Sequence, residues 1–305
     1  MKTSSLAGIA VLAGLGLLVG EIKAQDTPAP APAEAPAAPT ADGEAAMSPE
    51  EKAFLDVISS ITWETSGTGQ VGQYATLKVP AGYRYTGGAG TIKLMEAYGN
   101  LTNGSELGYI APDDLSWFAV FEFDECGYVK DDEKGSLDAT KIMKEMRENQ
   151  KEANKRMKEM GLPTLEIVGW HTEPFYNSAT NNLEWAVRLK SEASTSETIN
   201  YRTKLLGRRG VMDVVLVCSE DQLATVVPAY QQVLTGYAYN SDQSYAAFTK
   251  GDRIAEYGLT GLIVGGGLLA AAKSGLLGKL IKPIIAGVVI IGAFIKRLFS
   301  RKSEV

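Results

Sequence analysis

The sequence is poor in the residues that build reactive centres, with one histidine and two cysteines among its 305 residues. A single histidine excludes sites that need several imidazole ligands, and the sequence contains no C-x-x-C or H-x-x-x-H spacing. It also lacks the G-x-S-x-G pattern that exposes the nucleophilic serine of many hydrolases. We therefore expect no metal and no cofactor, and we assign no catalytic residue.

Long apolar runs are confined to the two ends of the sequence, and the first has the pattern of a secretory signal. Residues 6–19 are apolar and follow a basic start, which predicts a signal peptide over residues 1–24. Cleavage after Ala24 and retention as a signal anchor both remain open, because Ile22 occupies a position that favours a small residue. Residues 25–49 are rich in Ala, Pro and acidic residues, so we expect a disordered, extended linker there.

Two further apolar runs, residues 257–272 and 283–295, are separated and followed by Lys and Arg. They predict a membrane anchor over residues 254–299, followed by a basic tail over residues 300–305. Small residues on both runs favour a two-helix hairpin, whereas the basic residues after the second run favour a single span. Residues 50–253 then form an extracytoplasmic domain, which we expect in the periplasm of a bacterium and attached to its inner membrane.

The region between the signal and the anchor is acidic. Residues 25–272 hold 21 basic and 34 acidic residues, a formal charge of −13. Such a domain repels polyanions, so we expect no nucleic acid partner, and the lipid bilayer is contacted by the anchor and the basic tail. Residues 67–72 match G-x-G-x-x-G, but a strand-like segment follows them where a dinucleotide site needs a helix. We expect a flexible glycine loop there and no bound nucleotide.

The domain alternates between strand and helix patterns. The clearest helix is predicted over residues 138–160, where a narrow apolar stripe recurs at helical spacing among Lys, Glu and Arg. Short apolar segments between Gly, Asn or Ser turns predict strands, and other segments predict helices. The predicted strands are 73–80, 107–112, 116–125, 165–170, 183–192, 197–207 and 211–219, and the other helices are near 54–61, 89–98 and 221–236. The fold class is therefore α+β, a mostly antiparallel sheet of about five to seven strands covered by helices.

The two cysteines lie at the ends of two of these predicted strands: Cys126 follows one apolar run and Cys218 follows another. An oxidising compartment favours a disulfide between two cysteines of an exported chain. Buried free thiols are common in apolar strands as well. The sequence leaves both alternatives open.

Four residues are the best candidates for binding. Arg208 and Arg209 lie on a glycine-flanked hairpin turn of an acidic domain, where they either contact an anion or a partner or make the turn soluble. Trp170 either lines a ligand groove or packs a strand end against the core. His171 is either a surface residue or a general base paired with a carboxylate such as Glu173.

Several longer segments carry a family resemblance. They are GQYATLKVPAGYRY, GYVKDDE, LEIVGWHTEPFYNSATNNLEWA, INYRTKLLGRRGVM and AEYGLTGLIVGGG, which together span about residues 70–267. With them the sequence resembles a bacterial family of predicted membrane-anchored proteins that is known only as a domain of unknown function. The resemblance implies a signal peptide, an extracytoplasmic α+β domain and a C-terminal membrane anchor, and it implies no reaction or ligand.

Two functions from different classes fit these features. The first is a non-enzymatic envelope protein, a tethered binding or scaffold module with an envelope protein as partner. The second is an exported hydrolase that uses His171 with a neighbouring carboxylate. The lack of a nucleophile motif and of a metal-ligand set favours the first.

Overall fold

The computed structural model describes residues 49–265 except 99, 101, 160, 162 and 193–196, and its centre is an antiparallel sheet of seven strands. In sheet order the strands are β3 (Tyr83–Gly87), β4 (Glu106–Pro112), β5 (Phe118–Asp124), β9 (Val211–Cys218), β8 (Glu197–Leu206), β7 (Asn182–Ser191) and β6 (Leu165–Asn177). All neighbouring strands run antiparallel. The predicted α+β class and the predicted sheet are confirmed.

A second sheet and one helix cover one face of this large sheet. The small sheet has the order β1 (Thr68–Val71), β2 (Ala75–Lys78) and β10 (Tyr237–Tyr239), and the helix is α4 (Leu223–Leu234). Their apolar side chains form one buried cluster with alternate residues of the large sheet, such as Ala119 and Phe121 of β5. Two short 3-10 turns, Glu220–Gln222 and Tyr245–Ala247, lie in the connections.

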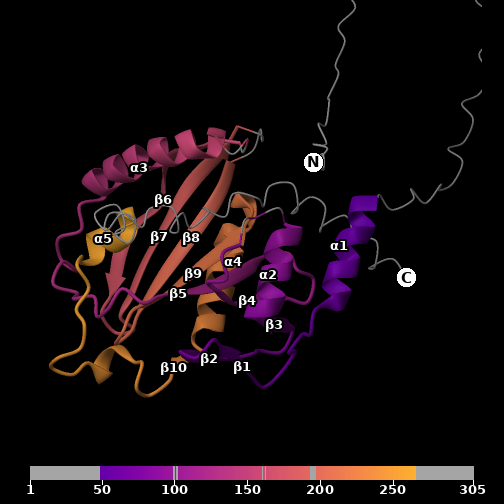
Figure 1. Cartoon of the computed structure of the whole chain (residues 1–305), viewed down its shortest axis with the longest axis horizontal. Coiled ribbons are helices and arrows are strands. Elements are labelled where there is room, and N and C mark those ends of the chain that lie inside the picture. The colour runs from indigo at the N-terminus through magenta and orange to yellow at the C-terminus, as the bar shows by residue number, and fades with distance from the viewer. Residues whose placement is uncertain are drawn as a thin grey trace, which may run out of the picture. The chain divides into compact units, whose positions relative to one another are not determined.

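Four helices cover the opposite face, in two separate groups. The first group, α1 (Pro49–Ser60) and α2 (Gly88–Ala97), packs on the β3–β5 end, where Phe118 and Val120 point toward it. The second group, α3 (Ala139–Glu159) and α5 (Leu259–Val264), packs on the β6–β7 end, as Figure 1 shows. Because successive strand residues face opposite sides, Phe118 and Ala119 belong to different clusters, and the core has two layers.

The helix α3 confirms the prediction for residues 138–160. Asp138 Oδ1 accepts the backbone N–H of Lys141 at 3.0 Å, as an N-cap side chain does. Ile142 and Met143 are buried against the sheet, and Met146 is partly buried beside them. Gly161 follows the helix with φ of +70°, the left-handed conformation that ends many helices.

The glycines of residues 67–72 do not form the predicted flexible loop. Residues Thr68–Val71 are β1, which pairs with β2. A Cβ atom at Gly69 would collide with the ring of Tyr85, which is fully buried, so the missing side chain lets β1 lie directly on that ring. The glycine pattern has a packing role here.

The start of the predicted membrane anchor belongs to the folded domain. Helix α5 lies inside the predicted range 254–299, yet Leu259, Leu262, Ile263 and Val264 are buried in the cluster that α3 forms with the sheet. Among the described residues, no helix is both long and apolar enough to cross a bilayer. The signal peptide and almost all of the linker, together with the rest of the anchor and the basic tail, lie outside the described residues.

Candidate functional site

Trp170 lines a groove between α3 and the middle of the edge strand β6. The groove has a volume of about 390 Å³ and is lined by Ala139, Thr140, Met143, Lys144, Arg147, Glu148, Lys151, Trp170 and Glu173. The indole Nε1 of Trp170 donates a hydrogen bond to the carbonyl of Ala139 at 3.1 Å, and the ring packs against the core cluster beneath α3. Both interpretations of Trp170 therefore apply, because the ring holds the strand against the helix and forms the wall of a groove.

Two side chains of α3 fasten the helix to the outer edge of β6. Arg147 donates to the carbonyls of Ile167 and Val168, with Nε at 3.2 Å and Nη2 at 2.6 Å. Asn154 donates to the carbonyl of Leu165 at 2.7 Å and accepts the N–H of the same residue at 3.1 Å. These bonds satisfy backbone groups that an edge strand leaves open, and they fix the two walls of the groove relative to each other.

His171 is exposed next to this groove, and it lacks the partner that a general base needs. Its Nδ1 lies 3.1 Å from Thr172 Oγ1, and no carboxylate among the described residues hydrogen-bonds to the ring. Glu173 is exposed and lines the groove. Phe175 is 40% exposed, whereas the hydroxyl of Tyr176 donates to Asn181 Oδ1 at 3.3 Å. The geometry does not assemble the pair that the hydrolase alternative requires.

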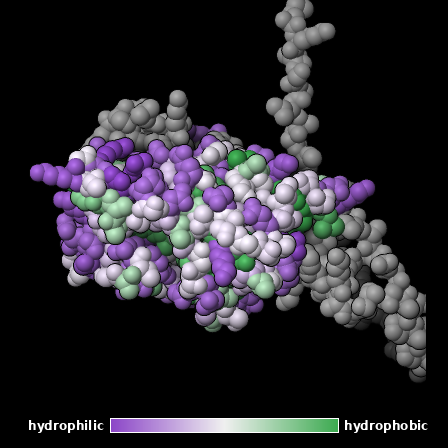
Figure 2. All heavy atoms as spheres, turned by 90° about the horizontal axis from the view of Figure 1, so that it is seen from below, coloured by the Kyte–Doolittle hydropathy of each residue, from purple (hydrophilic) through white to green (hydrophobic). Residues whose placement is uncertain are grey.

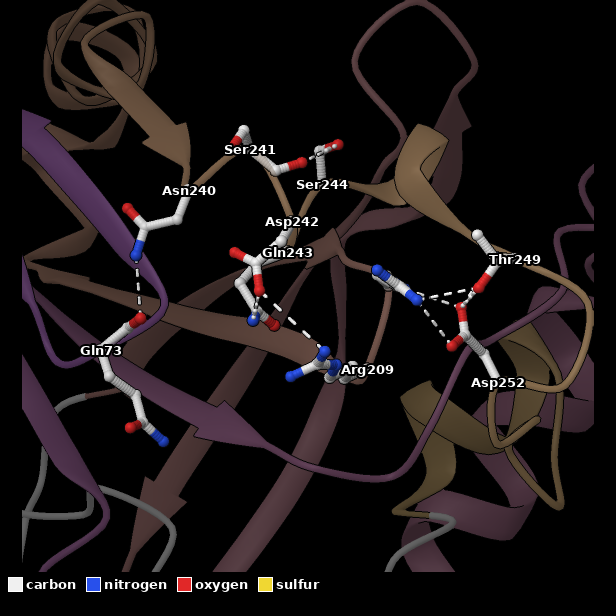
Figure 3. Close-up of polar contacts among 10 residues, drawn as sticks. Gln73, Arg209, Asn240, Ser241, Asp242, Gln243, Ser244, Thr249 and Asp252 are labelled. Carbon is white, nitrogen blue, oxygen red and sulfur yellow. Dashed lines mark hydrogen bonds and ion pairs between the residues drawn. The ribbon is translucent and has the colours of Figure 1, made fainter.

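Arg208 on the β8–β9 turn holds a neighbouring segment of the chain. Its Nε and Nη2 donate to the two carboxylate oxygens of Asp252 at 2.7 and 2.9 Å, and Nη2 also donates to Thr249 Oγ1 at 2.8 Å. Figure 3 shows Thr249 and Asp252 facing this turn. The hydrogen bond from Arg208, and next the bond from the Thr249 N–H, holds the pKa of Asp252 well below its usual range. Arg208 is therefore engaged within the domain, and its predicted role in binding a partner is not supported.

Arg209 has the opposite character. Its side chain is 57% exposed, and its Nη2 lies 4.0 Å from Asp242 Oδ2, which is itself exposed (Figure 3). The backbone of the same segment is anchored nearby, because Asn240 Nδ2 donates to the carbonyl of Gln73 at 2.8 Å. Of the two arginines, Arg209 is the one that can reach a partner. Seen from the β10 side, the surface mixes hydrophilic and apolar residues in small separate groups (Figure 2).

The two cysteines are free thiols. Cys126 and Cys218 are both buried, and they lie at opposite ends of the β5–β9 pair, in which Asp124 is opposite Val211. From this register we place them roughly 20 Å apart, far more than a disulfide allows. Burial, with a smaller contribution from a nearby aspartate in each case, raises the pKa of Cys126 to about 11 and that of Cys218 to about 12. The free-thiol alternative is the one that the structure contains.

Sequence reasoning missed a buried charged group at the centre of the large sheet. Asp213 of β9 is 1% exposed, and its Oδ2 lies 2.8 Å from Arg202 Nη1 and 2.7 Å from Lys204 Nζ, both on β8. The register places Lys204 directly opposite Asp213. An acid inside the apolar run VMDVVLVC was the available signal, because buried charges need a partner. These three residues form a structural ion-pair cluster.

Comparison with known proteins shows a family and a distant likeness to solved structures. The family model described as "Protein of unknown function (DUF2167)" matches residues 63–296. No curated protein matches the sequence. The solution structure of cyanobacterial PsbP (CyanoP) from Synechocystis sp. PCC 6803 matches over 54% of this chain and 86% of its own, with 11% identity and a TM-score of 0.34.

Proposed function

We propose a function from the geometry of the chain. The chain belongs to the family of proteins of unknown function (DUF2167), as its sequence resemblance indicated, and this family supplies no activity from which to argue. In this proposal it is a membrane-anchored, extracytoplasmic binding or scaffold protein of the bacterial envelope. The observation that carries the proposal is the groove between α3 and β6, whose aromatic wall, Trp170, and charged residue Arg147 are held in place by hydrogen bonds between the helix and the strand.

Binding fits this groove better than hydrolysis does. A hydrolytic site needs a nucleophile and a base within hydrogen-bonding reach of each other. The pair that the hydrolase alternative names, His171 and Glu173, shares no hydrogen bond in the described part of the chain, and Nδ1 of His171 lies 3.1 Å from Thr172 Oγ1. A groove with one half-buried aromatic wall and charged rims is typical of a surface that recognises another molecule.

The packing of α5 also favours one form of the proposed anchor. The first apolar run covers residues 257–272, and its residues up to Val264 pack in the core of the domain. Only seven residues of the run remain between Gly265 and Lys273. A span needs about 20 apolar residues, and even a strongly thinned bilayer does not accommodate seven. We therefore propose a single span around residues 283–295 with the basic tail in the cytoplasm, in place of the hairpin.

A cysteine at position 303 tests this topology. In a background with Cys126→Ala and Cys218→Ala, Ser303→Cys should resist an impermeant thiol reagent in intact spheroplasts and react after lysis. Labelling of intact spheroplasts would refute the single span and restore the hairpin. The same reagent should reach a cysteine at Lys93 of α2 without lysis, since Lys93 is exposed on the domain.

Photo-crosslinking in living cells tests the binding role. A photoreactive phenylalanine at Thr140, which is exposed and lines the groove, should capture a defined partner. The same residue at Lys93, on the opposite end of the sheet, serves as the control. Equal recovery of products from both positions, or none from Thr140, would contradict a binding role for the groove.

A further inference from the structure

The exposed surface of α3 is divided into two stripes of opposite charge. One stripe carries five basic residues at spacings of three and four, which places them on one side of a helix: Lys144, Arg147, Lys151, Lys155 and Lys158. The neighbouring stripe carries four acidic residues: Glu145, Glu148, Glu152 and Glu159. We call these the basic stripe and the acidic stripe.

The basic stripe lies along the outer edge of β6. Arg147, a member of the stripe, reaches the carbonyls of Ile167 and Val168. Asn149 lies on the other flank of the helix, because its Nδ2 donates to the carbonyl of Val264 in α5 at 2.7 Å. At about 100° per residue, positions 147 and 149 point in roughly opposite directions. The basic stripe therefore faces the outer edge of β6. We call the strip of surface along them, which includes the groove beside Trp170, the channel.

The channel carries more basic than acidic residues, because the five residues of the basic stripe outnumber Glu148 and Glu173, which also line the groove. Lys151 pairs with Glu148 and Lys155 with Glu152, each at 2.7 Å, so two of the five charges are partly neutralised. Lys144 and Lys158 form no salt bridge among the described residues. Helix α3 as a whole holds seven Lys or Arg against four Glu, whereas residues 25–272 carry a formal charge of −13. Charge is thus segregated onto one side of this helix.

We infer that this channel binds an acidic, extended segment of a partner protein, an inference that rests on the proposed binding function. From Lys144 to Lys158 the stripe is about 21 Å long, which matches about six residues of an extended chain. Acidic side chains of the segment would pair with the stripe, and an apolar side chain would lie against Trp170 and Met143. Main-chain pairing with β6 is limited, because Arg147 and Asn154 already occupy its first carbonyls and Pro174 offers no N–H.

An anionic membrane is the weaker occupant for the same stripe. A flat surface that approached the crest of α3 would meet Glu145, Glu148 and Glu152 as well, and their charge would oppose binding. A narrow chain that lies between the crest and β6 meets the basic stripe and the wall of Trp170, with Glu148 and Glu173 as the acidic residues of the groove, and it avoids Glu145 and Glu152. The position of the two stripes therefore favours a peptide over a bilayer.

Titration of the full-length chain with a labelled peptide tests this inference. The probe is a fluorescein-labelled peptide of about eight residues that alternates Glu and Val, and the matched probe carries Gln in place of Glu. Fluorescence anisotropy should show binding of the Glu probe, weaker binding in high salt, and little binding of the Gln probe. Vesicles with anionic lipid serve as a competitor, and strong competition by them would overturn the assignment to a peptide.

Two triple variants separate the stripe from the overall charge. Lys144→Gln with Lys151→Gln and Lys155→Gln should weaken binding of the Glu probe about tenfold, which corresponds to about 1.4 kcal/mol. Lys78→Gln with Lys93→Gln and Lys250→Gln removes the same charge from exposed positions outside α3 and should leave the affinity within about twofold. Equal losses in both variants would refute a local site. Circular dichroism of both variants checks that the fold is intact.

The failure of this inference is distinguishable from the failure of the proposed function. A partner that crosslinks from Thr140 and is recovered equally with the Lys144, Lys151 and Lys155 variant would leave the binding role intact and refute the acidic segment. The absence of any specific crosslink from Thr140 would instead refute the binding role itself.

Discussion

The two tryptophans on neighbouring strands β6 and β7 give the sharpest test of the packing beneath α3. Trp185 is 1% exposed inside the same core cluster against which Trp170 packs as a partly buried ring. Replacing a fully buried aromatic residue with Ala costs about 3–5 kcal/mol of the free energy of unfolding. We expect that range for Trp185→Ala.

Trp170→Ala should cost less, because part of the ring already faces the groove. About half of the aromatic contribution is roughly 2 kcal/mol, and loss of the hydrogen bond to Ala139 adds about 0.5–1 kcal/mol. We therefore expect a total of about 2–3 kcal/mol. Trp170→Phe retains most of the packing and should lose about 1 kcal/mol.

Urea unfolding followed by circular dichroism measures these differences without relying on tryptophan fluorescence. All variants are compared as full-length chains in the same detergent. If Trp170→Ala costs as much as Trp185→Ala, Trp170 is a core residue and the groove wall is misassigned. If it costs less than about 0.5 kcal/mol, the bond to Ala139 and the contact with the core contribute nothing, and the reasoning fails.

Three further predictions follow from the site. Arg208→Ala should increase hydrogen exchange in the segment around Asp252, whereas Arg209→Ala should leave it unchanged; equal effects would contradict the roles assigned to the two arginines. Folding lowers the pKa of Asp252, so the stability that this carboxylate contributes is complete above its ordinary pKa of 3.8 and is lost as the pH falls below that value. Acid should therefore loosen the segment around Asp252 in the native chain, whereas the Asp252→Asn variant should show no further loosening in acid. Cys126 and Cys218 should resist a thiol reagent in the native chain and give two adducts in denaturant without reductant, as mass spectrometry would show; no adducts there would indicate a disulfide.

Six of the seven strands of the large sheet could be predicted because their residues alternate or run apolar between turn residues, whereas β3 was missed and the predicted strand over residues 73–80 belongs to the small sheet. The hairpin between β8 and β9 is one example: Gly207 and Gly210 close it with an N–H to carbonyl bond of 2.8 Å, as the glycines predicted. Helix α3 was predicted for a similar reason, since its apolar stripe recurs along a sequence that is otherwise charged. The local sequence pattern was sufficient to predict elements whose apolar residues pack into the core of one large sheet.

The contacts between distant segments could not be predicted from local patterns. Strands β1 and β10 are short, and β10 pairs with β2 from more than 150 residues away. The role of Arg208 depends on Asp252, which lies 44 residues further along the chain. Trp170 was named from the sequence, but its partner Ala139 belongs to a different element. Sequence reasoning could name these side chains and could not name what they touch.

The predicted anchor range includes the buried helix α5 for a physical reason that applies beyond this chain. Hydropathy measures how strongly a segment avoids water, and both a bilayer and a protein core satisfy that tendency. The residues of α5 satisfy it by packing against α3, whose Asn149 also binds the carbonyl of Val264 at the helix end. A backbone carbonyl that is paired with a polar side chain is typical of a helix end inside a domain, because a membrane helix satisfies its carbonyls within itself. Asn149, a polar residue of α3, therefore binds the end of a folded neighbouring helix and not the start of a membrane span.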